Sequence, residues 1–277
     1  MKNINKKYRS RKLYGLWLLF ILATFALDGQ IKESRYFQIL KNQKIRIGMS
    51  VDYPPLKFEK EGKNIGIEID MASSLAEFLG VNTEIVPLSV KEYTSAIETN
   101  KVDVILGGMS RNLERGKKIW FSEPYLSITP AVFVNKRRLP KTKFGEEFEE
   151  IPYKTIWDIK KLAAFTFAVK EGSAYQSLIR SEFDKHKVIV VNSNKEGFEA
   201  VFSGSAHGFI HDSLFLEYTI KKNSQWKNGY AILKGGKRTE KICAGIPFGD
   251  TILKNQIDLW INEIIRKKEI DKWFLKY

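Results

Sequence analysis

Arg115 and Ser110 are the residues whose spacing first suggests chemistry. Arg115 follows Ser110 by five positions, and Ser110 closes a Gly-rich turn, GGMS at 107–110, that comes directly after the apolar stretch 102–106. Free backbone N–H groups at such a turn and the fork of a guanidinium can bind the same two oxygens, so this pattern predicts a carboxylate site. The spacing is equally compatible with Arg115 as a surface cation on a helix.

A second set of polar residues follows later strands of the chain. Asp212 comes after the apolar residues 208–210, and Lys170 and Ser173 come after the apolar residues 165–169. Ligands of open α/β sheets collect at the carboxyl ends of strands, so these side chains are candidates for the same site. Asp212 could pair with an ammonium group there, or it could serve only as the N-cap of the helix that follows.

Other chemistries find little support in the sequence. Ser205 is the second rather than the central residue of GSAHG at 204–208, which is not the nucleophile-elbow pattern. His207 and His211 are four positions apart, but on the strand expected there they would lie about 13 Å apart, too far to share a metal. Cys243 is the only cysteine, which excludes an internal disulfide, and its simplest role is that of a small buried hydrophobe. We therefore expect no metal and no cofactor.

The composition indicates an ordered chain with a mixed-charge surface. The 277 residues are 43% hydrophobic and carry 46 Lys+Arg against 32 Asp+Glu, a net charge of +14. Six of the basic residues precede residue 13, and without them the net charge is +8. No dense basic run is interleaved with aromatic residues, so we do not expect nucleic-acid binding.

The N-terminal segment, residues 1–29, has the pattern of a signal peptide or membrane anchor. The basic residues are followed by an uncharged run of 15 residues, 13–27. A helix of that length rises about 22 Å, short of the roughly 30 Å hydrocarbon core, which favours a signal peptide over a membrane-spanning anchor. No cysteine follows for lipid attachment. Either role places the chain from about residue 30 outside the inner membrane, and we expect a periplasmic protein that residues 13–27 could still tether.

The order of expected elements indicates an α/β protein with two similar units. Strands are expected at 45–49, 65–69, 83–88 and 102–106, with helices between them, and again at 165–169, 188–191 and 208–210; a last strand at 242–247 precedes a helix at 252–265. Such alternation predicts mostly parallel sheets flanked by helices. Two units predict two lobes, and a final helix that packs back on the first lobe gives two crossovers and a hinge.

Several stretches resemble a known family, the bacterial extracytoplasmic solute-binding proteins of polar amino-acid ABC transporters. They are IRIGMSVDYPPLKF (45–58), GIEIDMASSLAEFLG (66–80), NKVDVILGGMSRNLERGKKIWFSEPY (100–125), FAVKEGSAY (167–175), GFIHD (208–212) and IDKWF (270–274). The resemblance implies a periplasmic-binding-protein-like fold with a two-strand hinge. It places lobe 1 at 40–130 and 243–277, and lobe 2 at 131–242.

The resemblance also implies a ligand site. Gly108, Ser110 and Arg115 would hold an α-carboxylate, and Asp212, helped by the Gly108 carbonyl, would take the α-ammonium. The remaining residues would line the side-chain part of the site: Asp52, Tyr53, Lys170, Ser173 and His211, with Tyr53 stacking on the ligand. The sequence departs from the usual pattern at several positions, such as Val90 in place of an aromatic lid residue and Arg111 in place of a small one. These departures mean that the resemblance does not specify which ligand side chain is bound. Lys170, His211 and Arg111 favour a polar or acidic amino acid.

The implied activity is capture and delivery rather than catalysis. Ligand would bind lobe 1 of an open form, and lobe 2 would then close onto it. A monomer would hand the amino acid to the membrane permease of an ABC importer. Two alternatives stay open. One is a dehydratase on the same scaffold that acts on ring carboxylates, of the cyclohexadienyl or prephenate type, for which Glu171 is the one candidate acid. The other is a ligand-sensing domain.

Overall fold

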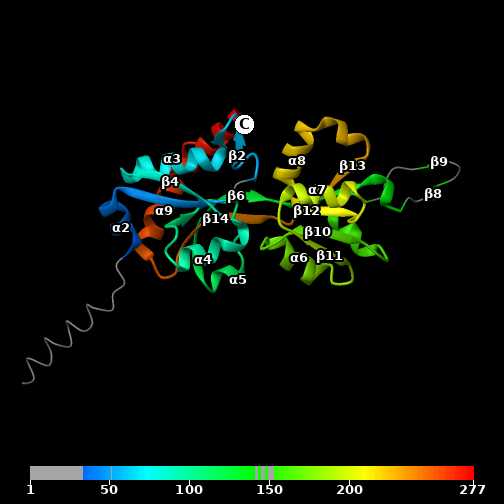
Figure 1. Ribbon diagram of the computed structural model, residues 1–277, viewed down its shortest axis with the longest axis horizontal. Helices are drawn as coiled ribbons and strands as arrows, with labels where there is room; N and C mark the ends of the chain where they lie inside the picture. The colour runs from blue at the N-terminus through cyan, green and yellow to red at the C-terminus, as the bar shows by residue number, and fades with distance from the viewer. Residues whose placement is uncertain (1–33, 51, 141–142, 145–146, 149–152) are drawn as a thin grey trace, which may run out of the picture.

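The computed structural model describes residues 34–50, 52–140, 143–144, 147–148 and 153–277, and within these ranges the chain forms two lobes side by side (Figure 1). The expected signal segment, residues 1–29, lies outside them. Within the described ranges, no helix has both the length and the apolar character that a membrane crossing requires.

The first lobe is built on a five-stranded sheet of order β4-β1-β5-β14-β6. Its strands are β1 (Lys44–Met49), β4 (Asn82–Pro87), β5 (Val104–Ile105), β6 (Ile119–Ile128) and β14 (Glu240–Pro247). Its helices are α2 (Arg35–Asn42), α3 (Ile67–Leu79), α4 (Tyr93–Glu98), α5 (Leu113–Gly116), α9 (Thr251–Arg266) and α10 (Glu269–Lys276), with the hairpin β2 (Phe58–Lys60) and β3 (Lys63–Ile65) at one edge. The sheet thus combines strands from both ends of the described chain.

The second lobe has a five-stranded sheet of order β11-β10-β12-β7-β13. Its strands are β7 (Pro130–Asn135), β10 (Thr166–Lys170), β11 (Lys187–Val191), β12 (Gly208–Asp212) and β13 (Tyr230–Lys234). Helices α6 (Ala174–Glu182), α7 (Asn194–Phe202) and α8 (Ser213–Lys222) flank it, and a small hairpin, β8 (Lys143–Phe144) and β9 (Glu147–Phe148), extends from its far end. All five sheet strands come from one continuous part of the chain.

Each sheet is mixed, with the same plan in both lobes. Three neighbouring strands pair in parallel, β4-β1-β5 in the first sheet and β11-β10-β12 in the second, and one strand of each sheet, β14 or β7, runs in the opposite direction between its two neighbours. This confirms a two-lobed α/β fold and limits the parallel pairing to three strands of each sheet.

Two paired strands connect the lobes. β6 and β14 are antiparallel from Ile119↔Pro247 to Ile128↔Glu240, and the chain passes between the sheets just beyond them (Figure 1). Two crossovers by paired strands restrict the relative motion of the lobes to bending of this pair. Because β14 starts at Glu240, the return to the first sheet begins slightly before the expected residue 243.

Local sequence explains most element boundaries and one wrong expectation. The alternation at 65–69 predicts a strand, but Gly66 adopts φ 134° and serves as the N-cap of α3, which starts at Ile67. The apolar residues Ile67, Met71 and Leu75 then lie on one buried helical face. Helix α2 was not expected from the sequence at all.

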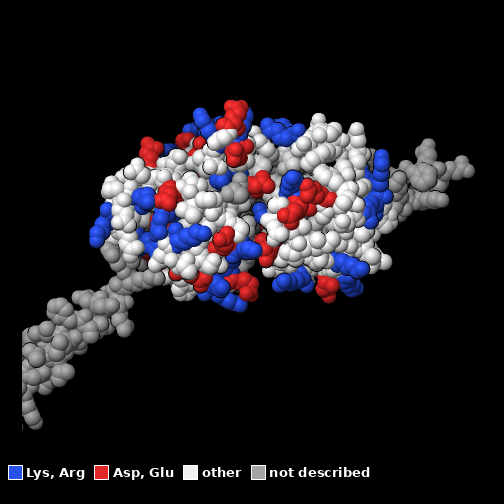
Figure 2. All heavy atoms as spheres, viewed as in Figure 1, with Lys and Arg blue, Asp and Glu red and all other residues white. Residues whose placement is uncertain are grey.

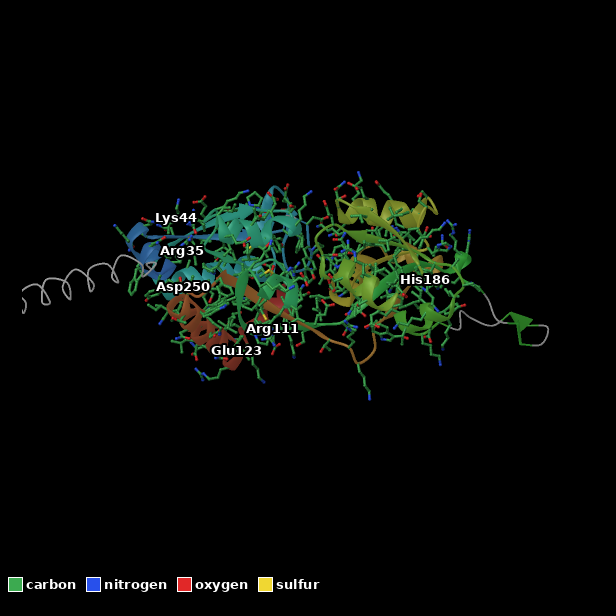
Figure 3. All side chains as sticks on the ribbon, turned by 90° about the horizontal axis from the view of Figure 1, so that it is seen from below. Arg35, Lys44, Arg111, Glu123, His186 and Asp250 are labelled. Atoms are coloured by element: carbon green, nitrogen blue, oxygen red, sulfur yellow. The ribbon has the colours of Figure 1, made fainter. Side chains whose placement is uncertain are left out.

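Ion pairs attach α2 to the first lobe. The Arg35 side chain, only 5% exposed, donates to the Asp103 carboxylate at 2.9 Å, and Arg46 donates to the same oxygen at 2.7 Å. Asp250 also accepts from the Arg35 backbone N–H at 2.7 Å, and Figure 3 shows Arg35 and Asp250 together at the end of this lobe. The buried Asp103 carboxylate thus pairs with two arginines, and its pair with Arg35 attaches α2 to the lobe.

The surface carries both signs of charge on both lobes. Figure 2 shows Lys and Arg intermixed with Asp and Glu over this face. Pairs such as Lys160–Glu182 and Lys272–Glu269, both at 2.8 Å, are largely exposed. Exposed pairs of this kind contribute little to stability, so the surface mainly confers solubility.

Candidate ligand-binding site

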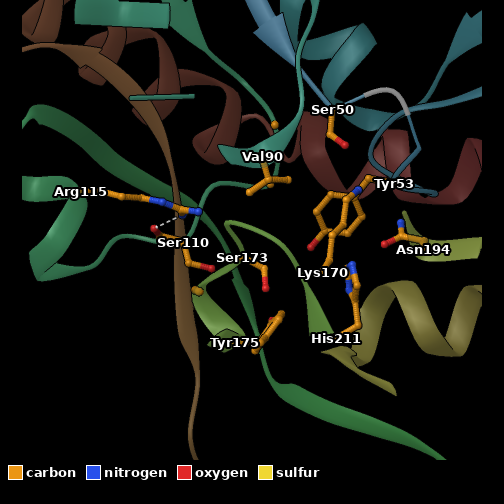
Figure 4. A pocket seen from close by; sticks show the side chains of 13 residues that line it. Ser50, Tyr53, Val90, Ser110, Arg115, Lys170, Ser173, Tyr175, Asn194 and His211 are labelled. Atoms are coloured by element: carbon orange, nitrogen blue, oxygen red, sulfur yellow. Dashed lines mark hydrogen bonds between the residues drawn. The ribbon is translucent and has the colours of Figure 1, made fainter. Parts of the chain in front are cut away.

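A small polar pocket lies between the lobes, beside the hinge. Its lining comprises Ser50, Tyr53, Val90, Gly107, Gly108, Ser110, Arg115, Lys170, Ser173, Ala174, Tyr175, Asn194 and His211. The space accessible to water in it is about 40 Å³, room for a few water molecules. Figure 4 shows that Arg115 and Lys170 lie at opposite sides of this pocket.

The Arg115 side of the pocket has the expected form. Asn112 caps the short helix α5 by accepting from the Arg115 backbone N–H at 2.9 Å, and the guanidinium donates to the Ser110 carbonyl at 2.9 Å. It also donates to the Gly172 carbonyl in the other lobe at 3.0 Å. Burial lowers the pKa of Arg115, a sign of a cation with little access to water. Its remaining N–H donors can hold an anionic group.

The Lys170 side of the pocket holds a cation and polar atoms without partners. Among the described residues, the Lys170 ammonium makes no hydrogen bond or ion pair, and burial lowers its pKa, an effect that the charge of Asp52 partly opposes. The buried Ser173 hydroxyl and the Asn194 side-chain oxygen likewise have no hydrogen-bond partner in the described part of the chain. Unpaired buried polar atoms are costly in a folded protein, so their grouping around one pocket indicates a binding site for a polar molecule.

Asp212 lies behind the pocket wall rather than in it. Its side chain is fully buried, accepts from the Tyr53 hydroxyl at 2.5 Å and the Phe215 backbone N–H at 2.8 Å, and lies 2.6 Å from His211 Nδ1. Burial opposes the ionisation of Asp212, but these partners outweigh it, and its pKa is lowered. Asp212 is therefore both the N-cap of α8 and the anchor of Tyr53.

Tyr53 fills the space over the Gly-rich turn. A Cβ on Gly108, whose φ is 60°, would come within 2.1 Å of the Tyr53 ring. The ring also contacts His211 edge to face, with centroids 5.1 Å apart. Close approach of a tyrosine to the backbone thus requires glycine at this position.

A buried carboxyl, that of Glu68, forms a hydrogen bond with the same Gly-rich turn. Glu68, at 1% exposure, accepts from the Gly108 backbone N–H at 2.7 Å and from the Tyr125 hydroxyl of hinge strand β6. Burial outweighs these two hydrogen bonds and raises the pKa of Glu68 to about 7. Glu68 therefore connects the pocket turn with the hinge.

Several contacts join the lobes across the cleft, so the structure is closed. Besides Tyr53–Asp212 and Arg115–Gly172, the Asn194 amide donates to the Asp52 carbonyl at 2.7 Å, and Lys91 pairs with Glu171 at 2.8 Å. Each contact takes one partner from each lobe. The closed form is thus held by a ring of polar contacts around the pocket.

The structure places seven of the nine expected site residues in the pocket lining: Tyr53, Gly108, Ser110, Arg115, Lys170, Ser173 and His211. The other two lie outside it. Asp52 is exposed at the rim, where its carbonyl rather than its side chain meets Asn194, and Asp212 is behind Tyr53. Sequence analysis missed Tyr175 and Asn194, which begin helices α6 and α7 at the carboxyl ends of β10 and β11.

Three other residues considered from the sequence, Arg111, Glu171 and His207, do not line the pocket. Arg111 does not add charge to the pocket, because its side chain is exposed on the first lobe, where Figure 3 labels it. Glu171 is occupied by Lys91 at the cleft rim. His207 accepts from the Thr166 backbone N–H at 3.0 Å, and the described residues contain no group of three or more His, Cys, Asp or Glu that could hold a metal.

Two lobes that close on a pocket around a two-strand hinge give the architecture of the solute-binding proteins. The match to a family model specifies which kind: residues 45–277 match the bacterial extracellular solute-binding proteins, family 3, and the chain belongs to this family.

Relatives of different kinds are similar to the chain. A cyclohexadienyl dehydratase of Pseudomonas aeruginosa is 29% identical over 201 residues, covering 72% of this chain and 70% of the relative. A putative amino-acid ABC transporter-binding protein, PatH of Vibrio harveyi, is 25% identical over 93% of this chain and 96% of its own length. The crystal structure of the ancestral amino acid-binding protein AncCDT-1, a precursor of cyclohexadienyl dehydratase, superposes with a TM-score of 0.74 at 26% identity, over 88% of this chain and 99% of that structure.

Proposed function

We propose that this protein captures an amino acid between its lobes and delivers it to the permease of an ABC importer. The observation that carries the proposal is the pocket with two different polar sides, a guanidinium with free donors at one side and the unpaired Lys170 at the other. Capture of this kind needs no oligomer, and we propose a monomer. The basic and apolar segment before residue 28 supports export to the periplasm.

We further propose that the ligand side chain is polar or acidic. The Lys170 ammonium has no hydrogen bond or ion pair in the described chain and only the charge of Asp52 favours it, while the Ser173 hydroxyl and the Asn194 side-chain oxygen have no hydrogen-bond partner there. An apolar side chain would leave all three groups unsatisfied, whereas a carboxylate would pair with Lys170 and Ser173, and an amide could also donate to the Asn194 oxygen. With Arg111 outside the pocket, this preference depends on Lys170.

A thermal-shift screen of the purified protein against the twenty amino acids tests the proposal. Binding to the folded state stabilises it by about 4 kcal/mol at 1,000 times the dissociation constant, which is about 10 °C for a chain of this size. Arg115→Ala is expected to abolish the shift, and Arg111→Ala, which removes a nearby exposed arginine, should keep it. No shift with any amino acid, or an equal loss in both variants, would contradict the proposal.

A dehydratase is the second candidate, favoured by the similarity to cyclohexadienyl dehydratase. Against it, the acid first considered, Glu171, is held by Lys91 at the cleft rim. Incubation with prephenate and arogenate, with product absorbance as readout, separates the two functions. We expect no product; turnover that Arg115→Ala abolishes would show that the protein is an enzyme.

A further inference from the structure

The hinge strand carries a carboxyl group that contacts a lining residue of the ligand pocket. Glu240 is the first residue of β14, paired with Ile128 where β6 ends. Its Oε2 accepts from the Ser110 hydroxyl at 2.7 Å, and Ser110 lines the pocket. The turn that carries Ser110 is also fixed to β14 by backbone hydrogen bonds, Arg111 N–H to Lys241 at 3.0 Å and Cys243 N–H to Met109 at 3.1 Å. Backbone hydrogen bonds therefore hold Ser110 and Glu240 in place relative to each other.

This contact determines which way the Ser110 hydroxyl points. A serine hydroxyl has one proton, and here the proton is donated to Glu240. The lone pairs of Ser110 then remain for the pocket. A ligand carboxylate beside them would meet acceptors only, whereas an ammonium group would donate to Ser110 and lie close to the negative charge of Glu240.

The carboxylate expected to bind an ammonium group is already occupied. Both oxygens of Asp212 accept hydrogen bonds, one from Tyr53 and one from Phe215, and Asp212 does not line the pocket. In the described chain the Ser110 hydroxyl donates to the Glu240 carboxyl, and burial raises the pKa of Glu240. Its charge also affects Tyr175 and Arg115, two further lining residues, by raising the pKa of the first and favouring the charged form of the second.

We propose that Glu240 is a positioning residue of the ligand site, which turns the Ser110 lone pairs into the pocket and so selects ligands that carry an ammonium group. The inference rests on the proposed function, because it assumes an amino acid in the pocket. Arg115 would then hold the ligand carboxylate, and Ser110 with Glu240 would form the ammonium side. Neither composition nor local sequence around residue 240 indicates this role.

The test compares an amino acid with its α-hydroxy acid, which lacks the ammonium group. The probe is the amino acid that gives the largest thermal shift in wild type, and affinities for both compounds are measured by calorimetry. Glu240→Gln retains an oxygen that can accept from Ser110 but removes the charge. It is expected to weaken amino-acid binding by roughly ten- to a hundredfold, the range for a hydrogen bond to a charged group, and to change hydroxy-acid binding less than about threefold. Glu217→Gln, an exposed carboxyl on α8, is the matched control and should change neither.

Four further outcomes decide the proposal. Equal losses for both compounds in Glu240→Gln would mean that Glu240 only supports the fold, and unchanged binding of both would mean that it plays no part; either result overturns the inference. If Glu240→Gln does not fold, Glu240→Asp should keep the preference for the ammonium compound, and Ser110→Ala should lose it. A wild type that binds no amino acid would refute the proposed function itself, a result that is distinct because it precedes any variant.

Discussion

Replacing Glu68 with glutamine should make the protein more stable above pH 7 and leave its stability at pH 4 nearly unchanged. Burial raises the pKa of Glu68 from an ordinary value of 4.5 to about 7. Between these two pH values the unfolded chain has lost the proton of Glu68 while the folded chain still binds it. The free energy of unfolding therefore falls as pH rises through this window, by about 3 kcal/mol in total at 1.36 kcal/mol per pH unit.

Glutamine suits this test because it keeps the contacts of Glu68. Gly108 and Tyr125 both donate to the same Glu68 oxygen, and an amide oxygen can accept from both. Urea unfolding at intervals from pH 4 to pH 8 should show the stability difference between variant and wild type growing by about 3 kcal/mol. Glu77→Gln, at an exposed position of the same helix, is the control and should show no such growth. A difference for Glu68→Gln that stays constant within about 0.5 kcal/mol, the usual range of surface substitutions, would refute the reasoning.

Three further predictions follow from the pocket and its surroundings. Gly108→Ala should abolish the ligand-induced thermal shift, because its Cβ would overlap the Tyr53 ring; Gly80→Ala, with a similar φ of 67° and open space around it, should lower stability by about 1 kcal/mol and keep the shift. Lys170→Met should raise the melting temperature without ligand, since burial disfavours the cation, and should lose the ligand shift; a lower melting temperature would contradict this. Burial raises the pKa of the Cys243 thiol to about 11, so a colorimetric thiol reagent at pH 7 should react only after unfolding.

The expected site residues that line the pocket share one property, which is that they follow strands whose apolar character is evident locally. Ser110, Lys170 and Ser173 are found by the rule that ligands gather at the carboxyl ends of parallel strands. The same rule applied to β11 would have found Asn194, three positions after Val191. No site residue was expected after that strand.

Other features could not be predicted because they depend on pairing between distant segments. Glu240 contacts the lining residue Ser110 only because β14 inserts beside the Gly-rich turn, and nothing near residue 240 indicates this. Asp212 was placed correctly at a helix N-terminus, but the sequence does not reveal that the Tyr53 hydroxyl covers it. Local alternation misled at 65–69, where Gly66 starts a helix instead. The fold class and the position of Arg115 at the site can thus be predicted from local sequence pattern. The charged groups around the pocket can be identified only from the tertiary structure.

The position of β14 inside the first sheet also affects the order of events during biosynthesis. β5 and β6 do not pair with each other; both pair with β14, and Ile105 contacts Gly245, 140 positions later in the chain. The second lobe, residues 130–234, has all its strands before β14 is made. A growing chain can therefore complete its second lobe but not its first, and contacts of such large sequence separation form slowly. Folding of the first lobe can therefore finish only after its last strand has been made.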